Sequence, residues 1–132
     1  MVKKITTKKS EKKVLLFPKN LLSPVGKFLK TRLELLEKRR KDIVSEDPFR
    51  DFSRTIDNAS PDTDAAEQFG HAKSSAIKKE LDKKIKQTKQ AIKKVKKGDY
   101  GICEDCTKMI DTDRLMIYPE ATLCAKCQTK RE

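Results

Sequence analysis

The sequence predicts a mainly α fold, because two long stretches repeat apolar residues at helical spacing and two Cys-x-x-Cys pairs follow them. Charged residues make up 39% of the chain and hydrophobic residues only 36%, which leaves little material for a large core. We therefore expect an antiparallel two-helix coiled-coil hairpin with a small four-cysteine zinc finger.

Three regions divide this architecture along the chain. Residues 1–20 carry many lysines and a single acid, Glu11, and are expected to form a basic, largely disordered N-terminal tail. This tail either makes weak contacts with nucleic acid or with a polymerase, or it only keeps the chain in solution. Residues 21–97 are expected to form the coiled coil, with an acidic tip around 47–66, and residues 98–132 the zinc-finger domain.

The first helix is predicted to start at Ser23, an N-cap residue that is followed by Pro24 at the first helical position. It should end near Glu46, since Pro48 disfavours helical geometry at the residue before it. A loop is expected to follow, and a short helical turn inside this loop stays open. The apolar stripe of the helix consists of Val25, Leu29, Leu36 and Ile43, with Phe28 and Leu35 beside it.

The second helix is predicted from the same start signal, Ser60 followed by Pro61, with acids in the first turn where the helix dipole favours negative charge. It should run for about 37 residues, or about 55 Å, to Gly98, which suits a left-handed helix end. Because neither helix can bury its stripe alone, the two should pair within a monomer; pairing with a second copy is the alternative. The second stripe consists of Phe69, Ala76 or Ile77, Leu81, Ile85, Ile92 and Val95.

Charge is distributed unevenly over this predicted hairpin. The net charge of +12 and the pI near 9.6 favour nucleic acid, an anionic surface or a nucleoprotein machine as a partner. Lysines concentrate between Lys73 and Lys97, whereas the bend from Glu46 to Glu67 is mostly acidic. Carboxylates at the end of a rod repel phosphates, so this polarity counts against a protein that only binds duplex DNA.

The strongest signal is a set of four cysteines, Cys103, Cys106, Cys124 and Cys127, with the spacing of zinc ribbons. Four thiolates complete a tetrahedron around zinc with no open position, so the site is predicted to be structural and the protein not to be an enzyme. An iron–sulfur cluster or a redox-active dithiol is the competing interpretation. The segment between the pairs should form a hairpin or turn around Arg114, and His71 should lie on the surface or in the seam.

We expect a cytoplasmic protein that does not associate with membranes. The longest uninterrupted apolar run, Val14 to Phe17, is too short to cross a bilayer, and no signal-peptide pattern precedes it. In a reducing compartment, closely paired cysteines bind metal more often than they form disulfides.

Three motifs stand out in residues 98–127: Gly98-Asp99-Tyr100-Gly101-Ile102-Cys103-Glu104-Asp105-Cys106, Asp113-Arg114-Leu115 and Pro119-Glu120-Ala121-Thr122-Leu123-Cys124-Ala125-Lys126-Cys127. Together they resemble the DksA/TraR zinc-finger family, and a looser similarity reaches back to Asp64. Members of that family are bacterial transcription regulators that bind RNA polymerase. The resemblance implies a coiled coil that enters the secondary channel, brings an acidic tip near the catalytic centre and alters open-complex lifetime, often together with the alarmone ppGpp.

The tip motif of the family, Asp-x-x-Asp-x-Ala, is matched in part. Asp64 and Ala66 coincide with its second aspartate and its alanine, while Pro61 stands at the first aspartate and Asp62 offers a carboxylate beside it. The resemblance thus implies Asp62, Asp64 and Ala66 as tip residues. A second departure is Thr107, where the family commonly has glycine, a change that strains the zinc knuckle without removing a ligand. Activation or repression, the target promoters and a role for ppGpp stay open.

Other functions stay open on the sequence alone. A zinc-ribbon protein that binds nucleic acid or the ribosome is the alternative, favoured by the net charge and the lysine-rich faces. A transcript-cleavage factor would use paired acids to hold a second magnesium ion in a polymerase. A free-standing enzyme is disfavoured, because the sequence shows no nucleophile–base pair, phosphate-cradling glycine loop or cofactor fingerprint.

Overall fold

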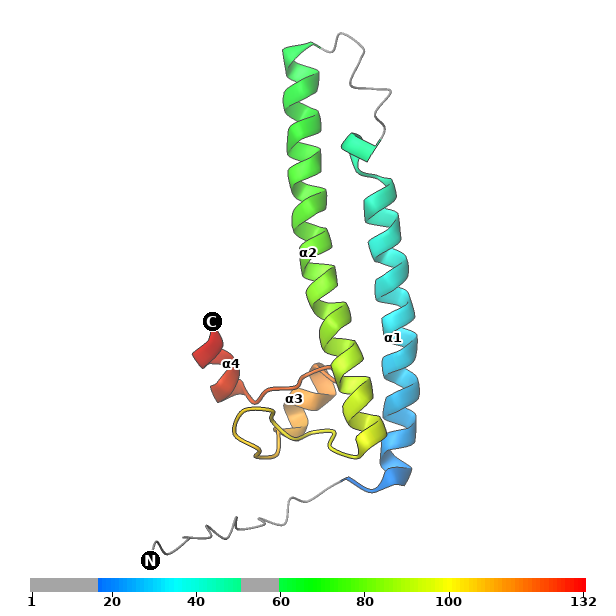
Figure 1. Cartoon of the computed structure of the whole chain (residues 1–132), viewed down its shortest axis with the longest axis vertical. Coiled ribbons are helices and arrows are strands. Elements are labelled where there is room, and N and C mark those ends of the chain that lie inside the picture. The colour runs from blue at the N-terminus through cyan, green and yellow to red at the C-terminus, as the bar shows by residue number, and fades with distance from the viewer. Residues whose placement is uncertain (1–16, 51–59) are drawn as a thin grey trace, which may run out of the picture.

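The structure, a computed structural model, describes residues 17–50 and 60–132. A long helical hairpin carries a small finger beside one end, which we call the base (Figure 1). Most of the predicted basic tail lies outside the described residues, and so does the segment 51–59 of the predicted acidic tip. Within the described ranges, no helix is both long enough and apolar enough to cross a bilayer.

Helix α1 spans Lys19–Ser45, so the predicted start at Ser23 was wrong. Pro18 takes the N-cap position, and its carbonyl oxygen accepts a hydrogen bond from the Leu22 amide at 3.3 Å. Pro24 consequently lies inside the helix, where its missing N–H costs one backbone hydrogen bond near the N-terminus. The extra turn forms because it buries Leu22 in the core at the base. The free energy gained by burying this side chain outweighs the backbone hydrogen bond that is missing at Pro24.

Helix α2 spans Pro61–Lys97, and both of its predicted ends are confirmed. Ser60 is the N-cap, and Pro61 occupies the first turn. Gly98 ends the helix with φ of 86°, a left-handed conformation that glycine adopts at little cost. Between the long helices lies η1, Pro48–Arg50, a single turn of 3-10 helix, which is the helical turn that the sequence left open.

The long helices run antiparallel and pack along the predicted seam (Figure 1). Leu29 of α1 is fully buried, and so, nearly, are Leu81 and Ile85 of α2, which are stripe residues of the predicted seam. The stripe of α2 had two candidates for one position, Ala76 or Ile77. Ile77 is partly buried and Ala76 is exposed, so Ile77 is the seam residue. Phe69 is 75% exposed, so its assignment to the seam was wrong. A Cβ atom at the next residue, Gly70, would lie 3.3 Å from Pro48, which follows the end of α1.

Thr88 is a seam residue that the apolar pattern missed. Its side chain is fully buried in α2, and its hydroxyl donates a hydrogen bond to the Lys84 carbonyl oxygen at 2.8 Å. The hydroxyl is thereby satisfied within its own helix, so the rest of the side chain packs as a small apolar group.

The main core lies at the base, where the finger packs against both long helices. It joins the buried side chains Leu22, Leu29, Ala91, Tyr100, Cys103, Ile110, Leu115, Leu123 and Cys127. Two short helices belong to the finger, α3 (Thr112–Ile117) and α4 (Ala125–Arg131). The predicted hairpin or turn around Arg114 was therefore wrong. The side chain of Asp111 caps α3 by accepting a hydrogen bond from the Asp113 amide at 3.2 Å.

Candidate metal centre

The first cysteine pair lies in a tight turn between Gly101 and α3. The Cys103 amide donates to the Lys108 carbonyl oxygen at 2.9 Å, and the Thr107 amide donates to the Cys103 carbonyl oxygen at 3.1 Å. An isolated antiparallel bridge between Ile102 and Met109 closes the base of the turn. These backbone bonds fix the Cα positions of Cys103 and Cys106, and hence the reach of both thiols.

The second pair stands at the start of α4. Cys124 is the N-cap residue of this helix, and Cys127 is buried in its first turn. The Gln128 amide donates to the Cys124 carbonyl oxygen at 2.9 Å, which continues the helix directly from the cap. One cysteine pair is thus supplied by a turn and the other by a helix end.

The four sulfur atoms of Cys103, Cys106, Cys124 and Cys127 all lie within 4.8 Å of one another. The Cys106 and Cys124 sulfurs are 3.7 Å apart. Zinc–sulfur bonds of about 2.3 Å in a regular tetrahedron place the sulfurs about 3.8 Å apart, so the cluster fits a zinc ion. Four protein thiols leave no open position on a tetrahedral ion, which is the arrangement of a structural zinc site.

Electrostatics explains why this cluster needs a cation. Burial raises the pKa of Cys103, but backbone N–H groups that face its sulfur outweigh burial and lower the pKa to about 6. One of them is the Cys124 amide, which donates to the Cys103 sulfur at 3.4 Å. The pKa of Cys127 is instead raised, to about 12, first by its neighbour Cys124 and then by burial. Thiolates crowded together repel one another, so a divalent cation is required to keep all four ionised.

Thr107, the predicted departure in the knuckle, has φ of 55°, the left-handed conformation that favours glycine. Its hydroxyl donates to the Cys106 carbonyl oxygen at 2.7 Å, a local bond that glycine could not make. The knuckle therefore keeps its shape with a threonine, at a backbone cost of about 1 kcal/mol.

The finger is attached to the hairpin by polar contacts that sequence reasoning missed. Lys94 of α2 donates to the Ile102 carbonyl oxygen at 2.6 Å and pairs with Glu104 at 3.6 Å. Arg32 of α1 pairs with Glu120 of the finger at 3.1 Å. Arg32 and Glu120 are 88 residues apart, Lys94 and Ile102 only 8, and no local motif indicates either contact.

Asp62, Asp64 and Ala66, the tip residues that the resemblance implied, lie in the first two turns of α2 and are exposed. They are at the far end of the hairpin from the cysteines (Figure 1). His71 contacts neither group: its Nδ1 lies 2.9 Å from both carboxylate oxygens of Asp47. This bond is the main cause of the lowered pKa of Asp47.

Residues 98–132 match the family model of the prokaryotic dksA/traR C4-type zinc finger. The RNA polymerase-binding transcription factor DksA of Escherichia coli (strain K12) is 42% identical over 50 residues, and that of Buchnera aphidicola subsp. Schizaphis graminum is 40% identical over 50 residues. An uncharacterized protein of Aquifex aeolicus is 40% identical over 48 residues. The matches cover 38%, 38% and 36% of this chain and 33% of each relative, so the chain spans about a third of the length of these relatives.

The similarity of fold extends further than the similarity of sequence. The solved structure of transcription factor DksA2 from Pseudomonas aeruginosa has a TM-score of 0.66 and 20% identity, and the match covers 88% of this chain and 86% of that one. The coiled coil therefore belongs to the shared fold as well as the finger. The sequence match to the prokaryotic dksA/traR C4-type zinc finger spans residues 98–132, and the four thiols gathered in that segment fit the zinc ion of such a finger.

Proposed function

We propose that the chain is a transcription regulator that binds RNA polymerase and inserts the acidic end of its coiled coil into the secondary channel to modulate initiation. One observation carries this proposal: exposed carboxylates of Asp62 and Asp64 stand at the end of a long helix whose other end is braced by the zinc finger. The relatives from Escherichia coli and Buchnera aphidicola are RNA polymerase-binding transcription factors, which supports the same partner.

The shape of the hairpin suits delivery into a narrow channel. Helix α2 has 37 residues, which corresponds to about 55 Å at 1.5 Å per residue. It continues beyond the end of α1, so among the described residues the first turns of α2 lie farthest from the finger (Figure 1). In this proposal the carboxylates change the hydration or the magnesium environment of the catalytic centre, and Ala66 leaves room for close approach.

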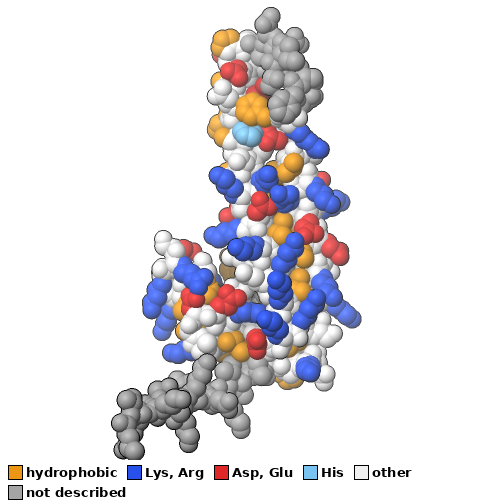
Figure 2. All heavy atoms as spheres, viewed as in Figure 1, with side chains coloured by type: hydrophobic (Ala, Val, Ile, Leu, Met, Phe, Trp, Pro, Cys, Tyr) orange, Lys and Arg blue, Asp and Glu red, His pale blue; other side chains and the backbone are white. Residues whose placement is uncertain are grey.

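The charge of the shaft supports the same mechanism. Figure 2 shows Lys and Arg side chains over the shaft and the base of the hairpin. Such a surface is attracted to acidic walls and steers the rod along them. The proposed protein is a cytoplasmic monomer that is not itself an enzyme.

The test uses purified bacterial RNA polymerase and the zinc-loaded chain. A photo-crosslinker in place of Asp62 should label the large catalytic subunits, and Asp64→Asn should abolish the effect on open-complex lifetime while binding persists. Asp99→Asn is the matched control, because Asp99 is an exposed aspartate at the opposite end of α2. Parallel assays with and without ppGpp decide whether the alarmone participates. A change in open-complex lifetime that is identical for the Asp64→Asn variant and the wild type would contradict the tip mechanism.

A further inference from the structure

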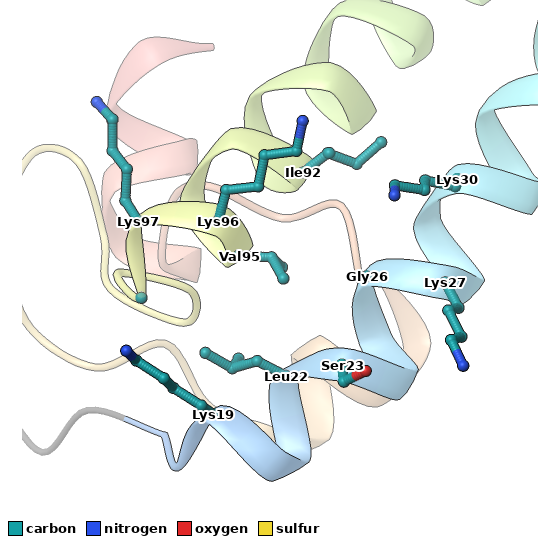
Figure 3. A pocket seen from close by; sticks show the side chains of 11 residues that line it. Lys19, Leu22, Ser23, Gly26, Lys27, Lys30, Ile92, Val95, Lys96 and Lys97 are labelled. Carbon is teal, nitrogen blue, oxygen red and sulfur yellow. The ribbon is translucent and has the colours of Figure 1, made fainter.

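A groove with a basic rim lies at the base of the hairpin, between the first turns of α1 and the last turns of α2 (Figure 3). Its volume is about 490 Å³. Leu22, Ile92 and Val95 supply apolar lining. The rim is formed by five lysines, and neither an acid nor an aromatic residue lines the groove: Lys19, Lys27 and Lys30 come from α1, and Lys96 and Lys97 come from α2.

Gly26 determines how closely the two helices approach in this groove. A Cβ atom at this position would lie 3.3 Å from Cγ1 of Val95, tighter than an ordinary van der Waals contact. A larger residue would therefore push α1 away from α2 or displace Val95. The glycine thus allows the close approach of α1 and α2 at the floor of the groove.

The rim lysines have no carboxylate partner among the described residues, and in this they resemble the mid-shaft lysines Lys78, Lys79 and Lys83; what sets them apart is that they surround one groove. Lys84, Lys89 and Lys94 pair with Glu80, Glu37 and Glu104, whereas no described ion pair contains a rim lysine. All five rim lysines are exposed. Like charges gathered around one depression repel one another, so an anion that neutralises them binds favourably.

We infer that this groove binds the phosphodiester backbone of a nucleic acid without reading its bases. Lysine binds phosphate as a point charge, whereas planar carboxylates are recognised best by the arginine fork, and the groove contains no arginine. Base recognition in single strands uses aromatic stacking, and the groove offers no aromatic ring.

The acidic tip does not oppose this binding. Tip and groove are at opposite ends of α2, about 55 Å apart for a helix of 37 residues. Screening in physiological salt removes interactions between exposed charges beyond about 8–10 Å. The inference is therefore independent of the proposed polymerase function, and it is tested without polymerase.

The test measures fluorescence anisotropy of labelled duplex DNA, and of single-stranded DNA of the same length, with the full zinc-loaded chain. A groove variant carries Lys27→Gln, Lys30→Gln and Lys96→Gln. A matched control carries Lys78→Gln, Lys79→Gln and Lys83→Gln, which removes the same charge from exposed positions in the middle of α2. The groove variant should lose roughly tenfold or more in affinity at about 0.1 M salt, with a log–log salt slope shallower by up to about 3. The control should lose much less.

A charge-preserving variant separates a local site from a folding defect. Lys→Arg at the same three groove positions should retain binding, because the positive charges remain. Equal losses in the groove variant and the mid-shaft control would overturn the inference, since net charge alone would then explain binding. Tighter binding of poly-glutamate than of DNA, with the same dependence on the groove lysines, would also overturn it in favour of an acidic protein partner.

Discussion

Arg32 of α1 donates a hydrogen bond from Nη2 to Oε1 of Glu120 in the finger at 3.1 Å, across 88 residues of sequence. The Glu120 side chain is only 8% exposed, whereas that of Arg32 is 36% exposed. Nε of Arg32 and Oε2 of Glu120 are buried and make no hydrogen bond with the described residues. Each group thus depends on the other for its charge partner, and the pair couples the finger to the hairpin.

Replacing Arg32 by methionine should lower the free energy of unfolding by about 1–3 kcal/mol, because it leaves the Glu120 carboxylate buried without a partner. Urea denaturation followed by circular dichroism measures this loss. Arg40→Met is the control: Arg40 pairs with Asp82 across the seam, but both side chains are well exposed. The control should cost less than about 1 kcal/mol. Equal losses would show that burial of Glu120 is not the cause.

Two glycines with the same backbone angle should respond differently to alanine. Gly98 and Gly101 both have φ of 86°, but a Cβ at Gly98 meets nothing within 4 Å, whereas one at Gly101 meets Cε2 of Phe17 at 2.6 Å. Gly98→Ala should therefore cost about 1 kcal/mol of unfolding free energy from backbone strain alone. Gly101→Ala should cost at least about 1 kcal/mol more, through the added clash.

A double-mutant cycle isolates the clash at Gly101. In a Phe17→Ala background the offending ring is absent, so Gly101→Ala should cost only as much as Gly98→Ala does. If Gly101→Ala costs as much unfolding free energy without the Phe17 ring as with it, the contact with Phe17 is not the source of the extra cost.

Tyr100 makes stability sensitive to alkaline pH. Burial, and then the negative charge of Glu120, raise its pKa from 10.0 to about 12. The folded protein holds the phenolic proton of Tyr100 more tightly than the unfolded chain does. The protonated side chain therefore makes its full contribution to the free energy of unfolding below pH 10.0, and this contribution is lost as the pH rises to about 12. Relative to Tyr100→Phe, the wild type should lose roughly 2 kcal/mol over this interval.

Urea unfolding at several alkaline pH values measures the difference between the two proteins, and lysine titration cancels because both contain the same lysines. Below this pH range, Tyr100→Phe should cost about 1 kcal/mol, since the tyrosine hydroxyl donates to the Pro119 carbonyl oxygen at 2.8 Å. Parallel stability curves for the two proteins would refute the titration of Tyr100 as the cause.

The contact between His71 and Asp47 should control local opening near the tip. The His71 ring also packs on Phe49, with ring centroids 4.5 Å apart, and the Phe49 amide donates to Oδ1 of Asp47 at 3.1 Å. His71→Ala should therefore speed hydrogen exchange at the Phe49 and Arg50 amides severalfold, while exchange at Leu29 in the core stays unchanged. The pKa of Asp47 is lowered from 3.8 in the folded protein. The stabilisation that the ionised Asp47 gains from His71 is therefore complete above pH 3.8, and it is lost as the pH falls through the lowered pKa.

Removal of zinc should unfold the finger and spare most of the helical signal. Dialysis against a chelator should abolish the near-ultraviolet signal of buried Tyr100, while far-ultraviolet dichroism falls little because α1 and α2 hold most of the helical residues. Cys127→Ser should reduce bound zinc below one ion per chain by metal analysis. A finger that keeps its Tyr100 signal without metal would contradict a structural role for zinc.

The sequence predicts the ends of α2 well because Ser60, Pro61 and Gly98 act through local backbone chemistry. It fails at the start of α1, where Pro18 and Pro24 give competing signals and the burial of Leu22 decides between them. It also misses α3, although Asp111 followed by Asp113 is a local cap that closer reading would find.

The metal cluster is predictable because cysteine spacing alone brings each pair together. The contacts that orient the finger are not predictable in this way. Arg32 and Glu120, or Lys94 and Glu104, look like ordinary solvated charges in the sequence, and only the packing of the finger on both helices brings them together. The position of His71 against Asp47 depends likewise on the bend between the long helices.

The attachment of the finger at one end makes the hairpin a lever arm. Over about 55 Å, a tilt of about 5° at the zinc-bound end displaces the opposite end by about 5 Å. Loosening the Arg32–Glu120 contact would therefore change where Asp64 is aimed, even though the two sites never touch. The position of the far end of the hairpin relative to the finger is therefore set by a few side chains at the base.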